Sequence, residues 1–245
     1  MPRLSTANDI INRAAVQCGL PKSNDPVGST DETFVRLTEL LNGAGQELVD
    51  LNPWQILQKP YQIVTTDLDT GNYDLPDDFG YMIDQTGWER SNAVPLGGPL
   101  SPQDWTYLKG LDLVSQTIYA SFRLVDNKFA IYPQPPPVGL DINFEYISLY
   151  WTATQGDTTN RYDTIRSGSD LVLFDTNMTV RFLKCKFLES TGMDSSSARM
   201  EFDLSFAGLI GKDVGAAVLN ASNGSRGYPY LQPYRNVGDT GYGGG

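Results

Sequence analysis

The spacing of apolar residues changes twice along the chain, from a helical period to a strand period and back again. In the first 59 residues, apolar positions recur every three or four residues, as in the buried stripe of an amphipathic helix. Thr6 and Asp9 have the spacing of a helix-capping pair, and Gly19 followed by Pro21 is a stop signal. These signals predict a first helix between Thr6 and Gly19.

A second helix is predicted from the capping pair Ser29 and Glu32 to Asn52-Pro53, because the residue before a proline disfavours the helical conformation. Its apolar stripe consists of Phe34, Leu37, Leu41, Ala44, Leu48 and Leu51. Two amphipathic helices joined by a loop of about ten residues favour a helical hairpin.

Residues 60–155 show the alternation and the β-branched and aromatic content that are typical of short strands. Segments 61–66 and 140–147 have this pattern, and segments 122–125 and 128–132 flank the polar pair Asp126-Asn127. Such a pair between two strand-like runs predicts a hairpin with a tight turn. Because Pro and Gly separate the runs, the pattern favours a small antiparallel sandwich or barrel.

Helical spacing returns after a polar loop that ends at Ser169. Asp170 is predicted to cap a helix that Gly192 breaks, and its apolar stripe consists of Leu171, Phe174, Met178, Phe182 and Cys185. Asp194-Ser195 is predicted to open a last helix, which carries on one face Ala198, Phe202, Phe206 and Leu209.

The last 24 residues, 222–245, have a different composition. They contain seven glycines, four tyrosines and two prolines, too few apolar residues to bury a core of their own. The tyrosines are spaced along the segment, and tyrosine and arginine are enriched at binding hot spots. We therefore expect a flexible tail that binds a partner.

The order of these segments predicts an α+β protein. A four-helix-bundle-like helical domain comprises residues 1–59 and 156–221, and an antiparallel β-sandwich or β-barrel domain of residues 60–155 is inserted into it. Residues 222–245 form an extended C-terminal tail. The insertion is inferred because neither helical hairpin makes a good core alone, whereas two hairpins packed on each other do.

Composition excludes several kinds of chemistry. The 245 residues include no histidine and two cysteines, which excludes His-based triads, His metal ligands and four-cysteine zinc or iron–sulfur sites. No phosphate-binding glycine loop or nucleophile elbow is found. We therefore expect no cofactor and no bound metal. No apolar run is long enough for a membrane span, and no signal-peptide core follows the first residues.

The net charge of −11 is concentrated in the middle of the chain. Residues 60–155 hold four basic and twelve acidic residues, out of 18 and 29 in the whole sequence. A chain this acidic is not expected to bind free duplex DNA, because such proteins bring excess Lys and Arg to the phosphates. Two interpretations stay open: a surface that favours solubility, or a conduit wall that repels a passing polyanion.

Paired carboxylates are the catalytic option that the composition leaves. The pairs Asp67/Asp69 and Asp77-Asp78 are close in sequence, but aspartates beside Pro or Gly usually form turns. A peptidoglycan hydrolase needs two carboxyl groups, one of them with a raised pKa, and the candidate here is Glu89 or Glu145 acting with a nearby Asp.

Three tryptophans of the middle segment allow two interpretations. Trp88, Trp105 and Trp151 can fill a core, or they can form a platform on which a carbohydrate stacks. A carbohydrate- or receptor-binding module on the β domain is therefore kept as an alternative to the hydrolase.

Four motifs occur in a fixed order along the chain. The opening helical hairpin carries IINRAA at 10–15 and FVRL at 34–37, and it exits through Asn52-Pro53-Trp54. The middle segment carries NYDLPDDF at 72–79, and then IYPQPP at 131–136 before an aromatic strand that ends at Tyr150-Trp151. A closing helix pair with a C-terminal extension follows. In this order the motifs resemble the head-to-tail adaptor (connector) proteins of short-tailed bacteriophages, of the tail tubular protein A type.

The resemblance implies a structural virion protein and no enzyme. It implies a homo-oligomeric ring of twelve copies at the head–tail interface, assembled in the cytoplasm of the host bacterium. The ring would join the portal protein of the head to the tail nozzle protein, contact tail fibres in some members, and form part of the channel through which viral DNA is ejected without sequence-specific binding. On this resemblance, the C-terminal tail is predicted to anchor in clefts of the portal through Arg226, Tyr228, Tyr230, Leu231, Tyr234, Arg235 and Tyr242.

Overall fold

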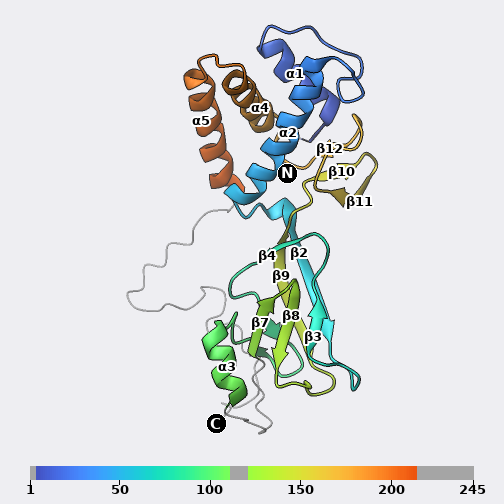
Figure 1. Cartoon of the computed structure of the whole chain (residues 1–245), viewed down its shortest axis with the longest axis vertical. Coiled ribbons are helices and arrows are strands. Elements are labelled where there is room, and N and C mark those ends of the chain that lie inside the picture. The colour runs from blue at the N-terminus through green and yellow to red at the C-terminus, as the bar shows by residue number, and fades with distance from the viewer. Residues whose placement is uncertain (1–3, 111–120, 214–245) are drawn as a thin grey trace, which may run out of the picture.

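The computed structural model describes residues 4–110 and 121–213. Within these residues the chain forms an elongated body with five α-helices and antiparallel sheets, which confirms the mixed α and β composition. The helices of residues 7–17, 32–51, 176–190 and 196–213 gather at one end, and most strands lie at the other (Figure 1). We call residues 4–57 and 149–213 the helical lobe, and the described residues of 58–148 the β lobe.

The first two helices begin at polar caps, as their sequences predict. Helix α1 (Ala7–Gln17) has Thr6 as its N-cap, whose hydroxyl accepts a hydrogen bond from the Asp9 N–H at 3.2 Å. Helix α2 (Glu32–Leu51) is capped by Asp31, not by the predicted Ser29. The Asp31 carboxylate accepts from the Thr33 N–H, while Ser29 accepts from the Asp31 N–H and so orders the preceding turn.

The predicted start of the next helix is wrong by five residues. Helix α4 (Thr176–Ser190) is capped by Asp175, and it is followed by α5 (Ser196–Asp213). Asp170 instead closes a loop, because its carboxylate accepts hydrogen bonds from the backbone N–H groups of Arg166 and Ser167. The apolar residues after it form the short strand β12 (Leu171–Val172), and α4 then packs against α1, α2 and α5.

A small antiparallel sheet completes the helical lobe. Its strand order is β1 (Ser5–Thr6), β12, β10 (Thr152–Thr154) and β11 (Asp157–Tyr162). The predicted polar loop therefore contains a strand, β11, which the sequence pattern missed because most of its residues are polar and not buried. Trp151 precedes β10 and is fully buried in the core of the helical lobe.

The β lobe consists of two antiparallel sheets and a helix. The sheet nearer the helical lobe contains β2 (Gln58–Val64), β4 (Phe79–Met82), β5 (Trp88–Glu89), β6 (Val94–Pro95) and β9 (Asp141–Ser148). The other sheet contains β3 (Asn72–Asp74), β8 (Lys128–Tyr132) and β7 (Ser121–Val125). Within the described residues these sheets do not close, so the barrel alternative is wrong. Helix α3 (Pro102–Gly110) was not predicted.

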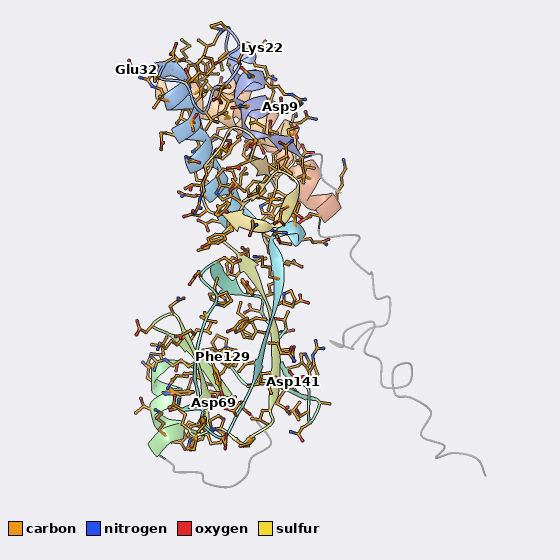
Figure 2. The ribbon with its side chains drawn as sticks, turned by 90° about the vertical axis from the view of Figure 1, so that its right-hand side faces the viewer. Asp9, Lys22, Glu32, Asp69, Phe129 and Asp141 are labelled. Carbon is orange, nitrogen blue, oxygen red and sulfur yellow. The ribbon has the colours of Figure 1, made fainter. Side chains whose placement is uncertain are left out.

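The two sheets meet at a stack of phenylalanines. The rings of Phe122 and Phe129 lie 4.9 Å apart, and those of Phe129 and Phe144 lie 5.3 Å apart. Figure 2 places Phe129 inside the β lobe, far from Asp9 and Glu32 at the opposite end of the molecule. The predicted hairpin is confirmed: β7 and β8 pair around Asp126 and Asn127, which both have a φ of 53°.

One strand pair runs from one lobe into the other. Strands β2 and β9 pair over seven positions, from Gln58↔Ile147 to Val64↔Asp141. Ile147 packs in the core of the helical lobe, whereas Ile142 packs in the core of the β lobe. The residues 146–148 are all buried, because there the strand passes from a sheet with one covered face to a region covered on both.

Several predictions lie outside what the structure describes. The tail of residues 222–245 is outside the described residues, and the domain boundaries after residues 59, 155 and 221 stay predictions. Among the residues described, no helix combines the length and apolarity needed to cross a bilayer.

Candidate functional site

A polar hollow of about 310 Å³ lies where the two lobes join. It is bordered by the start of β2, the segment before β4, and β11 of the helical lobe. Its lining residues are Lys59, Asp77, Asp78, Tyr150, Thr159, Asn160 and Arg161. We call this region the waist.

Asp78 is the centre of the waist. Its side chain is 10% exposed, and its carboxylate accepts hydrogen bonds from Lys59 Nζ at 2.6 Å, Ser148 Oγ at 2.6 Å and Tyr146 Oη at 2.9 Å. Lys59 is on β2, and the other two donors are on β9. One buried carboxylate therefore ties both strands of the connecting pair to the loop before β4.

Burial and hydrogen bonding act on this carboxylate in opposite directions. Burial raises the pKa of Asp78, but the hydrogen bonds from Lys59, Ser148 and Tyr146 lower it more, so the pKa lies below its ordinary value. Burial and the neighbouring Asp78 carboxylate both raise the pKa of the Tyr146 hydroxyl. Tyr146 therefore stays a neutral donor to an ionised Asp78.

Arg161 extends this network into the helical lobe. Its guanidinium donates from Nη1 to the Ile56 carbonyl at 2.9 Å and from Nε to the Thr158 carbonyl at 3.1 Å. Burial lowers the pKa of Arg161, while the negative charge of Asp78 counteracts this shift. The waist thus holds a carboxylate between two cations, an arrangement that fixes the geometry of three chain segments.

The sequence identified the Asp77-Asp78 pair but assigned it to a turn. That interpretation misses Asp78, whose partners lie 19, 68 and 70 positions away along the chain. For Asp69 the turn interpretation is confirmed, because its carboxylate accepts from the Thr66 N–H at 2.6 Å and from the Tyr73 hydroxyl.

The structure does not bring Glu89 and Glu145 together. Glu89 on β5 pairs with Ile142 of β9, and side chains that pair directly share a face. Glu145 lies three positions further along β9, so it points to the opposite face of the sheet. A glycoside hydrolase needs its two carboxyl groups to flank the glycosidic bond that it cleaves.

Glu89 is also a poor general acid. Its carboxylate is fully buried and accepts hydrogen bonds from the Ser91 N–H, the Asn92 N–H and the Asn92 amide, each at 2.8 Å. Burial raises the pKa of Glu89, but these hydrogen bonds lower it more, so its net shift is downward. The raised pKa that a catalytic acid requires is therefore missing at this residue.

The three tryptophans do not form a common platform. Trp151 is fully buried in the helical lobe, where its ring lies 6.2 Å from Phe174 and its Nε1 donates to the Asp163 carbonyl. Trp105 is 7% exposed on α3, and Trp88 is 38% exposed on β5. The core-filling interpretation is confirmed for Trp151 and Trp105, and Trp88 alone presents an exposed ring.

The remaining predicted site residues cannot be placed. Arg226, Tyr228, Tyr230, Leu231, Tyr234, Arg235 and Tyr242 all lie outside the described residues. Among the residues that are described, no three acidic or cysteine side chains are grouped so that they could hold a metal ion.

One protein family matches the chain. The model of the SU10 adaptor protein family matches residues 5–177, a span that contains the whole β lobe, the small sheet of the helical lobe, and helices α1 and α2. No curated protein matches the chain. The family match confirms the resemblance to phage head–tail adaptors and indicates a structural virion protein that forms oligomers and contacts other virion components. The narrower likeness to the tail tubular protein A type stays a prediction.

Proposed function

Because the chain belongs to the SU10 adaptor protein family, we propose that it is the subunit of a ring between the phage head and tail. In this proposal twelve copies bind the portal protein on one side and the tail nozzle on the other, with tail fibres as a further possible contact. The ring lines part of the channel through which viral DNA is ejected. The family match over residues 5–177 is the observation that carries this proposal.

The shape of the subunit supports a connecting role. The two lobes present separate surfaces at the ends of an elongated body (Figure 1), and the β2–β9 pair runs between them. The ionised Asp78 ties this pair to its surroundings through Lys59, Tyr146 and Ser148. A subunit built this way can hold two partners at a fixed spacing. A closed ring of identical copies further requires two different side surfaces on each copy.

The charge of the β lobe supports a channel wall. Among its described residues, seven acidic side chains are exposed and only Arg90, Lys109 and Lys128 are exposed basic residues. The exposed acidic residues are Asp67, Asp74, Asp77, Asp84, Asp104, Asp126 and Glu145. A surface with this excess repels the phosphate backbone, so a polyanion can pass without being held.

The C-terminal tail is proposed as the segment that binds the portal. Tyrosines and Leu231 would fill portal clefts, while Arg226 and Arg235 would pair with portal carboxylates. A tail that becomes ordered only on its partner pays its ordering entropy at the docking site, which suits a ring that assembles on the portal.

The test is the mass of the protein alone and after mixing with its portal protein, measured by light scattering behind a sizing column. We expect a complex containing twelve copies of the chain per portal ring. A chain lacking residues 222–245 should lose this complex, whereas the control variant Asn236→Ser should retain it. An unchanged mass on mixing wild-type chain with portal contradicts the adaptor function; a truncated chain that binds normally contradicts only the role of the tail.

A further inference from the structure

An apolar groove of about 630 Å³ opens at the end of the helical lobe that faces the waist. It is larger than the waist hollow, and its size is typical of sites that bind a ligand or peptide side chains. Six of its ten lining residues are apolar, and they come from four separate segments of the chain: Leu4, Trp54, Ile56, Leu173, Phe174 and Leu209.

The aromatic floor of this groove is rigid. Trp54 and Phe174 are each at most 5% exposed, and their rings meet edge to face at 5.7 Å. The Trp54 Nε1 donates to the Leu48 carbonyl at 2.6 Å, which fixes the indole. Leu4, Ile56 and Leu209 are only partly buried around this floor. A preformed apolar concavity of this kind favours an apolar or aromatic occupant.

The described part of the chain ends at the rim of the groove. Asp213, the last residue of α5, lines it, and its carboxylate accepts a hydrogen bond from the Gln55 N–H at 3.0 Å. The Gln55 side-chain amide also donates to the Asp213 carbonyl. The 32 residues that follow, 214–245, therefore begin at a point that is fixed beside the groove.

We propose that Tyr228-Pro229-Tyr230-Leu231 of the same chain docks in this groove while the protein is free. These four consecutive residues are the densest apolar run of the last 24 residues. Tyrosine supplies a large contact area at a small entropy cost, and proline restricts the free chain, which reduces the cost of ordering it. The charged residues at the rim are Asp175, Lys212 and Asp213, so the rim has a net negative charge that Arg226, two residues before the run, complements.

The connecting length permits this contact. Tyr228 lies fifteen positions after Asp213, and this length of chain spans at most about 50 Å when extended. As a flexible chain the same segment has an end-to-end distance of about 20 Å, so a groove at its origin meets the tail at a millimolar effective concentration. Weak intrinsic affinity therefore suffices for docking within one chain.

Docking in the groove would regulate the portal-binding role proposed above, and in that respect it rests on the proposed function. The same tyrosines cannot occupy the groove and the portal at once, so each copy would release its tail only where portal clefts compete for it. A substitution in the groove that prevents the tail from docking should then strengthen portal binding, because the portal no longer has to displace the tail from the groove.

Limited trypsin digestion of the full-length chain tests the docking directly, because the only Lys or Arg residues in the last 32 are Arg226 and Arg235. We expect cleavage after Arg226 to be about tenfold slower in the wild type than in Leu209→Asp, which places a charge in the groove. The matched control is Leu204→Asp, on the same helix but 68% exposed, which should be cut as slowly as the wild type.

A second variant leaves the folded lobes untouched. Tyr228→Ser combined with Tyr230→Ser should abolish the protection of Arg226 from trypsin as fully as Leu209→Asp does. Asn236→Ser should leave that protection unchanged. Equal cleavage of the wild type and the double-tyrosine variant would overturn the proposal. Protection that disappears on dilution would also overturn it, because the occupant would then be the tail of a second copy.

The portal mass measurement separates the two proposals. If Arg226 is unprotected but the portal complex forms, the groove proposal fails and the adaptor function stands. If Arg226 is protected and the mass does not change with portal, the adaptor function fails and the groove proposal stands.

Discussion

The two lobes bury their cores in different ways. The buried core residues of the β lobe come from a single interval, 63–146, whereas those of the helical lobe lie before position 58 or after position 146. The helical lobe buries 24 residues in its core and the β lobe buries eight. The larger core is therefore the discontinuous one, and it depends on the β lobe to hold its two halves at the right spacing.

The largest loss of stability is expected when the residue that joins those halves is replaced. Trp151→Ala should reduce the free energy of unfolding by about 3–5 kcal/mol, because it leaves a cavity in the helical lobe and removes the stack on Phe174. Urea unfolding followed by circular dichroism measures this loss. A loss below 1 kcal/mol would show that the two halves of the core are not coupled through Trp151.

The next effect concerns the waist, which belongs to neither core. Asp78→Asn should reduce stability by about 2–3 kcal/mol at pH 7, because Lys59 is then left without its buried counter-ion. Lys59 is 30% exposed, so the loss is smaller than for a fully buried pair. Ser121→Asn, on a strand of the outer sheet, is the control for a polar substitution in the β lobe.

The pH dependence of the same variant gives an independent readout. The folded-state pKa of Asp78 lies below the unfolded value of about 3.9, so its stabilisation is complete above that pH. The stabilisation is lost as the pH falls through the folded-state pKa. The difference in unfolding free energy between wild type and Asp78→Asn should therefore shrink below about pH 4; a constant difference would exclude ionisation of Asp78 as its cause.

A pair of glycines on α2 tests how tightly the helical lobe is packed around Trp151. A Cβ on Gly45 would lie 2.3 Å from the indole ring, whereas a Cβ on Gly43 would meet no atom within 4 Å. Gly45→Ala should reduce stability by about 1–3 kcal/mol through overpacking. Gly43→Ala, its matched control, should increase stability by up to about 1 kcal/mol through helix propensity. Thermal unfolding of both variants distinguishes the expected loss of stability from the expected gain.

In the β lobe a conservative change should have a smaller, local effect. Phe129→Leu removes the middle ring of the stack with Phe122 and Phe144, and we expect a loss of about 1–2 kcal/mol. Hydrogen exchange should increase within residues 58–148 and stay unchanged in α1 and α4. Equal acceleration in both lobes would mean that they unfold as one unit.

The smallest effect concerns the hairpin turn. Asn127→Ala should reduce stability by about 1 kcal/mol, because alanine tolerates a φ of 53° poorly, while Asn127→Gly should remain near wild type. Melting temperatures of the two variants provide the comparison. Identical melting temperatures would show that the backbone of this turn changes on substitution.

Local signals predicted much of the fold. Thr6 and Gly19 bound α1, Asn52-Pro53 ends α2, and Asp126-Asn127 forms the hairpin turn, because each signal acts through its immediate neighbours. The family resemblance also came from the order of short motifs. The errors occurred where a distant contact overrides local preference: Asp170 closes a loop before β12 instead of capping a helix, and the polar strand β11 pairs with β10.

The sequence by itself determined most element types, with α3 and β11 as exceptions, the concentration of negative charge in the middle segment and the kinship with phage adaptors, since all three depend on residue order and composition. Only the tertiary structure decided that Asp78 is a buried counter-ion, that Glu89 and Glu145 face opposite sides of a sheet, and that an apolar groove adjoins Asp213. These features depend on pairing register and on contacts between residues far apart in the chain, which local patterns do not specify.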